Sequence, residues 1–149
     1  MNSSKKYNFQ FVQGEIPTQE LSNQLKSFSD LYEAGAYSIF LGQVRKDKIE
    51  NKLVESIDYT ANEEMAKEQF TKMLSETCNL HAIERVSIVH SLGIVKSGGL
   101  CLMVIVACGH RKQSFVACEY IVERLKKEVP IWGKELFEDQ SHQWKVNKF

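Results

Sequence analysis

Proline is scarce in this sequence, and the composition typical of a disordered chain is absent. Among 149 residues only two are proline, while hydrophobic residues make up 43% and aromatic residues 10%. Such a composition is typical of a chain that buries a core, and it excludes a disordered one. The length suits one domain of ordinary size, so we expect residues 1–149 to form a single domain.

An excess of charge is lacking as well. Nineteen lysines and arginines balance nineteen aspartates and glutamates. Nucleic-acid-binding domains usually carry a basic excess, and RNA-binding modules often add an aromatic-basic motif. The sequence has neither, so we expect no nucleic-acid partner. A neutral total still leaves room for a local basic pocket that binds a small anion.

Long apolar runs and paired cysteines are absent too. The longest apolar run, 100–108, is far shorter than the roughly 20 residues of a membrane-spanning helix. Residues 1–7 lack the apolar segment of a signal peptide, so we expect a cytoplasmic protein with no membrane contact. We also expect reduced thiols and no metal site, because the cysteines and histidines show no ligand spacing: Cys78, Cys101, Cys108, Cys118, His81, His90, His110 and His142.

Hydrophobic periodicity predicts the secondary structure. Apolar and β-branched runs predict strands, and apolar positions three or four apart predict helices. The strands are expected at 7–12, 36–45, 53–59, 83–92 and 100–108, and the helices at 18–28, 62–77 and 114–129. The polar segment 46–52 is expected to be a loop, and Asn62 is a candidate cap for the second helix. We expect 36–45 and 53–59 to form a hairpin. The order predicts an α+β fold, a mostly antiparallel sheet covered by helices.

The last predicted helix carries the most informative lysine. Its buried stripe is expected to contain Phe115, Cys118, Val122, Leu125 and Val129, and Pro130 should end it. Lys126 lies at the border of that stripe, where partial burial lowers an amine's pKa and favours a base or nucleophile. The commoner interpretation of such a lysine, judged by position alone, is a stem that covers apolar surface.

Cationic residues follow two of the predicted strands. Arg45, Lys46 and Lys48 follow the first, and His110, Arg111 and Lys112 follow the second. Each is most simply a solvated charge. If they converge, the arginines and a helix start at Ser114 favour a small phosphorylated ligand.

The segment after Pro130 is unusual. Gly133 can take a positive φ and turn the chain, which would project Lys134 beside the end of the Lys126 helix. Beyond it, Trp132, Trp144 and Val146 offer enough apolar surface to dock the tail.

Three segments together resemble the large, catalytic subunit of molybdopterin synthase. Residues 35–45 are similar to the family's Gly-Ala…Phe-x-Gly-x-Val-Arg, 109–118 to its His-Arg-x-x-Ala-Phe, and 125–135 to its Leu-Lys-x-x-x-Pro-Ile-Trp-Lys-Lys-Glu. Each segment alone is a weak signal, but their order and spacing are specific. The similarity extends over about 7–146.

This resemblance implies a fold and a reaction. The fold is an α/β hammerhead, and the assembly is a homodimer of large subunits within a heterotetramer. Each large subunit binds a small ubiquitin-like carrier that ends in a thiocarboxylate. The enzyme is a sulfurtransferase: sulfur passes to cyclic pyranopterin monophosphate and forms the molybdopterin dithiolene, with no metal or bound cofactor.

The resemblance also assigns residues. Lys126 and Lys134 are implied as catalytic, and the substrate site is implied to comprise Gln43, Val44, Arg45, His110, Arg111, Lys126, Gly133, Lys134 and Glu135. The sequence departs from the family where Gly133 replaces a lysine, and at Thr60, Asn62 and 90–93. A second subunit can complete the family's pocket, and Lys148 is a candidate for that contribution.

Two other functions stay open. A carrier-binding homologue without catalytic activity is suggested by Gly133, since a lysine implicated in the chemistry is missing there. A nucleotide- or RNA-binding module is suggested by the basic strand ends, although the zero net charge argues against it.

Overall fold

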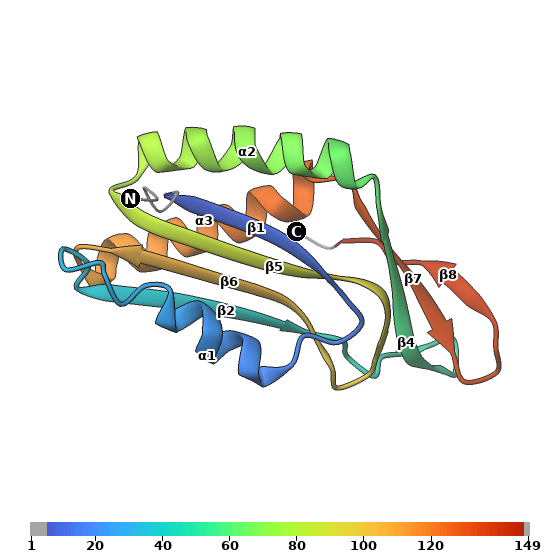
Figure 1. Cartoon of the computed structure of the whole chain (residues 1–149). Coiled ribbons are helices and arrows are strands. Elements are labelled where there is room, and N and C mark those ends of the chain that lie inside the picture. The colour runs from blue at the N-terminus through green and yellow to red at the C-terminus, as the bar shows by residue number, and fades with distance from the viewer. Residues whose placement is uncertain (1–5, 148–149) are drawn as a thin grey trace.

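The computed structural model describes residues 6–147, which form one sheet with three helices (Figure 1). The helices are α1 (Thr18–Lys26), α2 (Glu63–Leu80) and α3 (Arg111–Glu128). The strands are β1 (Tyr7–Gln13), β2 (Ala36–Gln43), β3 (Lys48–Ile49), β4 (Lys52–Ala61), β5 (Ile83–Lys96), β6 (Leu100–Cys108), β7 (Ile131–Phe137) and β8 (His142–Trp144). The strand order β2-β6-β5-β4-β7-β8, with β1 beside β5 and β3 beside β4, confirms the predicted α+β class.

The central strands are buried on both faces, which explains the continuous apolar run at 100–108. In β6, Val104 and Val106 pack with side chains of α2 and α3, whereas Met103 and Ile105 pack with α1. Figure 1 shows the same division, with α1 on one side of the sheet and α2 and α3 on the other. Alternate residues of a strand point to opposite faces, so a strand covered on both sides can be apolar at every position.

The expected hairpin between 36–45 and 53–59 is wrong. β2 pairs antiparallel with β6 instead, from Ala36 opposite Cys108. The hairpin that forms joins β3 to β4 around Glu50 and Asn51, both with positive φ. The polar segment 46–52, predicted as a loop, thus contains a two-residue strand and a tight turn. After this turn, β4 pairs with β5 and β7.

Residues after Pro130 form strands rather than a docked tail. β7 pairs with β4 and with β8, and Gly133 lies inside β7 opposite Tyr59, not in a turn with positive φ. Trp132, Trp144 and Val146 are 51%, 60% and 78% exposed, so the expectation that they dock the tail is wrong. Backbone hydrogen bonds to β4 hold this segment, and the large apolar side chains are not needed for that purpose.

Helix details follow the sequence more closely. Asn62 caps α2 as predicted, since its side-chain oxygen accepts a hydrogen bond from the Met65 N–H at 3.1 Å. α3 ends at Glu128, before Pro130, but begins at Arg111 rather than at Ser114. Its buried face is also displaced from the predicted stripe, because Ala117 and Ile121 are buried while Phe115 is 63% exposed.

No metal cluster and no disulfide occurs among residues 6–147: no group of three His, Cys, Asp or Glu side chains could hold an ion, and the four cysteines are free. In the same range, no helix is long and apolar enough to cross a membrane.

Candidate active site

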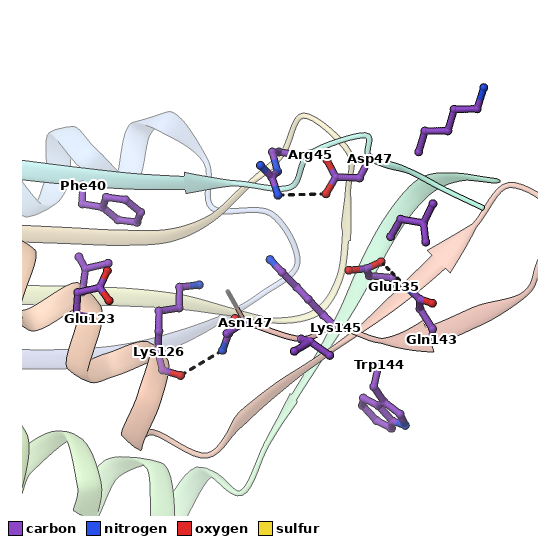
Figure 2. A pocket seen from close by; sticks show the side chains of 14 residues that line it. Phe40, Arg45, Asp47, Glu123, Lys126, Glu135, Gln143, Trp144, Lys145 and Asn147 are labelled. Atoms are coloured by element: carbon purple, nitrogen blue, oxygen red, sulfur yellow. Dashed lines mark hydrogen bonds and ion pairs between the residues drawn. The ribbon is translucent and has the colours of Figure 1, made fainter. Parts of the chain in front are cut away.

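A large cavity lies between the C-terminal end of α3, the segment after β2, and the β7–β8 pair (Figure 2). Its volume is about 800 Å³. We call it the outer cavity; its lining includes four cationic and three acidic residues: Arg45, Lys48, Lys126, Lys145, Asp47, Glu123 and Glu135. Segments that are far apart in the sequence therefore bring opposite charges around one space.

Lys126 lies in the last turn of α3 and points toward this cavity (Figure 2). Its side chain is half-buried, and burial lowers the pKa of its amine, with a further lowering from the positive charge of Lys145. The C-terminal segment is fastened at the same place, because the Asn147 side-chain amide donates to the Lys126 carbonyl oxygen at 3.2 Å. The predicted effect of burial on this lysine is confirmed.

Arg45 forms another wall of the outer cavity. The preceding Val44 is 1% exposed, and its N–H donates to the Gly99 carbonyl at 3.0 Å. This anchor fixes the backbone where the strand ends. The Arg45 guanidinium itself is exposed and contacts the Asp47 carboxylate at 3.2 Å. An exposed pair of this kind contributes little stability, so the guanidinium can exchange Asp47 for another anion.

Glu135 is the buried acid of the site. It lies in β7 at 7% exposure, and its carboxylate accepts a hydrogen bond from the Gln143 side-chain amide at 3.2 Å. The paired positions Glu135 and Gln143 both line the outer cavity, which shows that this face of β7 and β8 is turned toward Lys126.

A second, smaller cavity of about 100 Å³ adjoins the first and shares Lys126, Lys145 and Asn147 with it. We call it the inner cavity; Tyr59, His90 and Gly133 also line it. Burial lowers the pKa of His90 to about 4, so its ring is neutral near pH 7. Burial likewise raises the pKa of Tyr59, whose hydroxyl donates to Cys101 Sγ at 3.4 Å. The inner cavity is thus lined by uncharged polar groups beside two amines.

The structure brings only some of the predicted site residues together. Arg45, Lys126 and Glu135 line the outer cavity, and Gly133 lines the inner one. Gln43 ends β2 close to Arg45 and is exposed. Lys134 lies opposite Trp144, with its amine 5.7 Å from the centre of the indole ring, and lines neither of the two cavities.

His110 and Arg111 are at the other end of α3. Arg111 is the first residue of this helix, fifteen positions before Lys126. At about 1.5 Å per residue, this separation is roughly 22 Å. Both side chains are exposed and line neither cavity, so a single chain does not gather all the predicted cations around one ligand.

The sequence analysis missed Lys145, His90, Tyr59, Gln143 and Asn147 as lining residues. The alternation of polar Gln143 and Lys145 with apolar Trp144 and Val146 is a weak strand signal that could have revealed two of them. No local sequence pattern marks His90 and Tyr59 as lining residues, since both occupy ordinary positions of predicted strands.

Comparisons with known proteins agree with this architecture. Residues 13–128 match the family model described as MoaE protein. A molybdopterin synthase catalytic subunit from Bos taurus is 35% identical over 114 residues, which are 76% of this chain and 60% of that protein. The chain thus spans about three fifths of this relative's length.

Solved structures are similar over nearly the whole chain. The crystal structure of molybdopterin synthase from Staphylococcus aureus has a TM-score of 0.81 and 30% identity, and the match covers 93% of this chain and 97% of that one. A complex of subunits 1 and 2 of a molybdopterin-converting factor from Helicobacter pylori 26695 contains a chain with a TM-score of 0.77 and 24% identity, covering 94% and 91%. The second likeness concerns the fold alone.

Proposed function

Because this chain belongs to the MoaE protein family, we propose that it is the catalytic subunit of a molybdopterin synthase. In this role it transfers sulfur from the C-terminal thiocarboxylate of a small ubiquitin-like carrier to cyclic pyranopterin monophosphate. The observation that carries the proposal is the half-buried Lys126 amine at a cavity that also presents Arg45. The proposed reaction uses such a pairing, because the substrate carries a phosphate that a cation can bind and the transfer releases a proton that an amine can accept.

The residues of the outer cavity take distinct roles in this proposal. The Arg45 guanidinium binds the substrate phosphate in place of Asp47, because its planar donors match phosphate oxygens. The thiocarboxylate sulfur bonds to the pterin side chain and displaces an oxygen group there. Water then cleaves the acyl carbon–sulfur bond of the resulting thioester, which leaves a carboxylate on the carrier, and neutral Lys126 accepts the proton that this water gives up. Glu135 holds Gln143, and Gln43 and Val44 keep the strand end in position. The cavity volume of about 800 Å³ leaves room for a pterin and the end of a carrier tail.

We infer that His110 and Arg111 contribute their side chains to the substrate cavity of a second subunit. Their exposure and the roughly 22 Å along α3 that separate Arg111 from Lys126 support a contribution in trans. This interpretation implies the homodimer of large subunits, and with two carriers the heterotetramer. Lys148, the other candidate for a contribution in trans, lies outside the described residues.

The remaining assignments complete the proposal. The chain acts as a single domain in the cytoplasm and uses no bound cofactor or metal. Lys134 is a second amine near the reaction only if the Trp144 contact is released, since its side chain now lies over that ring. A carrier-binding protein without catalysis is the competing candidate, and the observation that favours it is Gly133 inside β7.

Reconstitution tests the proposal. The chain is combined with a thiocarboxylated carrier and cyclic pyranopterin monophosphate, and the dithiolene product is quantified. Lys126→Ala should lower the rate roughly 10²- to 10⁴-fold, the usual range for a lost acid–base group. Lys72→Ala, at an exposed lysine on α2, is the matched control and should leave the rate unchanged.

Two results would contradict the proposal. Near-normal turnover by Lys126→Ala would reject the assigned role of this lysine. Carrier binding by the unmodified chain without any pterin sulfuration would favour the non-catalytic candidate instead.

A further inference from the structure

Two lysines, Lys126 and Lys145, line both cavities of the candidate site. Lys145 directly follows β8, and its N–H donates to the Gly133 carbonyl oxygen at 2.8 Å, so the ladder between β7 and β8 continues through this residue. Its side chain lines both cavities together with Lys126. Figure 2 shows Lys145 reaching into the outer cavity from the β8 side while Lys126 points into it from α3.

Strand register explains why Lys145 points inward and Lys134 does not. Lys134 lies opposite Trp144, and Glu135 lies opposite Gln143. Residues directly opposite in an antiparallel pair share a face, and the face alternates along each strand. Lys145, opposite Gly133, is therefore on the face of Glu135 and Gln143. Lys134, opposite Trp144, is on the other face and lines neither cavity.

Because Gly133 has no side chain, it leaves open the part of the inner cavity that Lys145 also lines. A Cβ atom at position 133 would meet Ile57 Cγ2 at 3.0 Å and the ring of Tyr59 at 3.3 Å, which is closer than ordinary packing allows. β7 itself thus supplies no side chain at this point of the inner cavity. The amine that reaches the cavities near this point comes from the neighbouring segment instead.

The charged groups around Lys126 do not neutralise either amine by a direct ion pair. Neither Lys126 nor Lys145 forms an ion pair with a carboxylate in the described part of the chain. The titratable and charged groups around Lys126 come from every adjoining element: Glu123, Arg45, Asp47, Lys48, Tyr59, His90, Cys101, Glu135 and Lys145. Arg45 already has Asp47, and Glu135 is engaged by Gln143. Tyr59 and His90 are uncharged near neutral pH.

We propose that Lys145 is a positioning residue of this site, whose ammonium, held opposite Gly133, disfavours a proton on Lys126. A positive charge beside a half-buried amine raises the cost of a second positive charge, and low dielectric strengthens the effect. The lowered pKa of Lys126, to which Lys145 contributes after burial, agrees with this role. Its effect on turnover rests on the proposed function, whereas its effect on the proton of Lys126 does not.

The first experiment measures that proton directly. Lysines of the full chain are reductively methylated with ¹³C-formaldehyde, which preserves their charge, and each signal is titrated by NMR; Lys126→Arg identifies the signal of Lys126. In Lys145→Met the Lys126 titration should move to higher pH. In Lys145→Arg, and in the control Lys72→Met, it should stay where it is in the unmodified sequence. An unchanged titration in Lys145→Met overturns the proposal.

The second experiment measures turnover against pH in the reconstituted reaction. Activity that needs neutral Lys126 rises through its pKa, so Lys145→Met should shift this rise to higher pH. The rate should fall on the order of tenfold near pH 7 and recover in more alkaline buffer. Lys145→Arg should restore the original profile, because it restores the charge.

The outcomes separate three cases. If Lys145→Arg is as inactive as Lys145→Met at every pH, Lys145 contacts the reacting atoms and the positioning role is overturned. If neither the unmodified chain nor any variant turns over while the NMR titration shifts as expected, the proposed function fails and the inference about Lys126 stands. Thermal unfolding of each variant identifies a loss that comes from misfolding.

Discussion

The central strands and the β4–β7–β8 region are built in different ways. β5 and β6 are covered on both faces, and most of their side chains are fully buried. β7 and β8 adjoin the candidate site and carry exposed residues such as Trp132 and Trp144. Side-chain packing defines the first region, whereas backbone ladders and register define the second. The candidate site therefore adjoins the region where the sequence pattern is weakest.

The largest expected effect is on the central strands. Ile105→Ala removes a fully buried side chain that packs with α1 and should lower the free energy of unfolding by about 2–5 kcal/mol. The control Ile94→Ala, at a position on β5 next to β4 that is 56% exposed, should change it by no more than about 0.5 kcal/mol. Urea unfolding measures both. Equal losses would show that side-chain burial is not what stabilises the central strands.

The next effect is at the boundary, where His90 on β5 borders the inner cavity. Its folded-state pKa is about 4, below the ordinary 6.5, so the unfolded state takes up a proton first as the pH falls. The stability that neutral His90 provides above pH 6.5 is therefore lost as the pH falls toward 4. Between pH 7 and pH 5 the free energy of unfolding should fall by about 2 kcal/mol.

The pH dependence is measured by urea unfolding at pH 7 and pH 5. His90→Gln should flatten the difference, while His142→Gln, at an exposed position on β8, should leave it as it is. A loss of stability that persists unchanged in His90→Gln would mean that other groups cause it.

The smallest effect is expected on β8. Trp144 is 60% exposed and packs under the Lys134 amine, 5.7 Å from its ring centre. Trp144→Leu keeps an apolar side chain but removes the cation–π contact, so the loss of stability should be about 0.5–1 kcal/mol. Thermal and urea unfolding would measure it. A loss as large as that of Ile105→Ala would show that this region also depends on side-chain packing.

Sequence patterns were reliable where burial and periodicity agree. The run at 100–108 is β6 to the residue, Asn62 caps α2, and α3 ends before Pro130. Lys126 was correctly placed at the border of a buried stripe, although the stripe itself is displaced from Phe115 to Ala117. The partner of β2 was predicted wrongly, because an apolar alternation does not specify which strand lies beside it.

The site was predicted less completely than the fold. Arg45 and Lys126 meet at one cavity, but His110 and Arg111 are a helix length away, and Lys134 lies on the wrong face of β7 for this cavity. Lys145 was missed because 131–144 was treated as a tail. Its direction depends on a one-residue alternation that only the strand pairing defines.

By itself, the sequence determined which segments are buried, where two helices begin or end, and that a charged amine lies beside the core near Pro130. These properties follow from local chemistry: hydrophobic period, capping oxygen atoms and the restricted backbone of proline. Only the tertiary structure decided which strands pair, which face of β7 is turned toward Lys126, and that Lys145 lines the same cavities as Lys126. Such properties depend on contacts between residues far apart in the chain, and neither composition nor period carries that information.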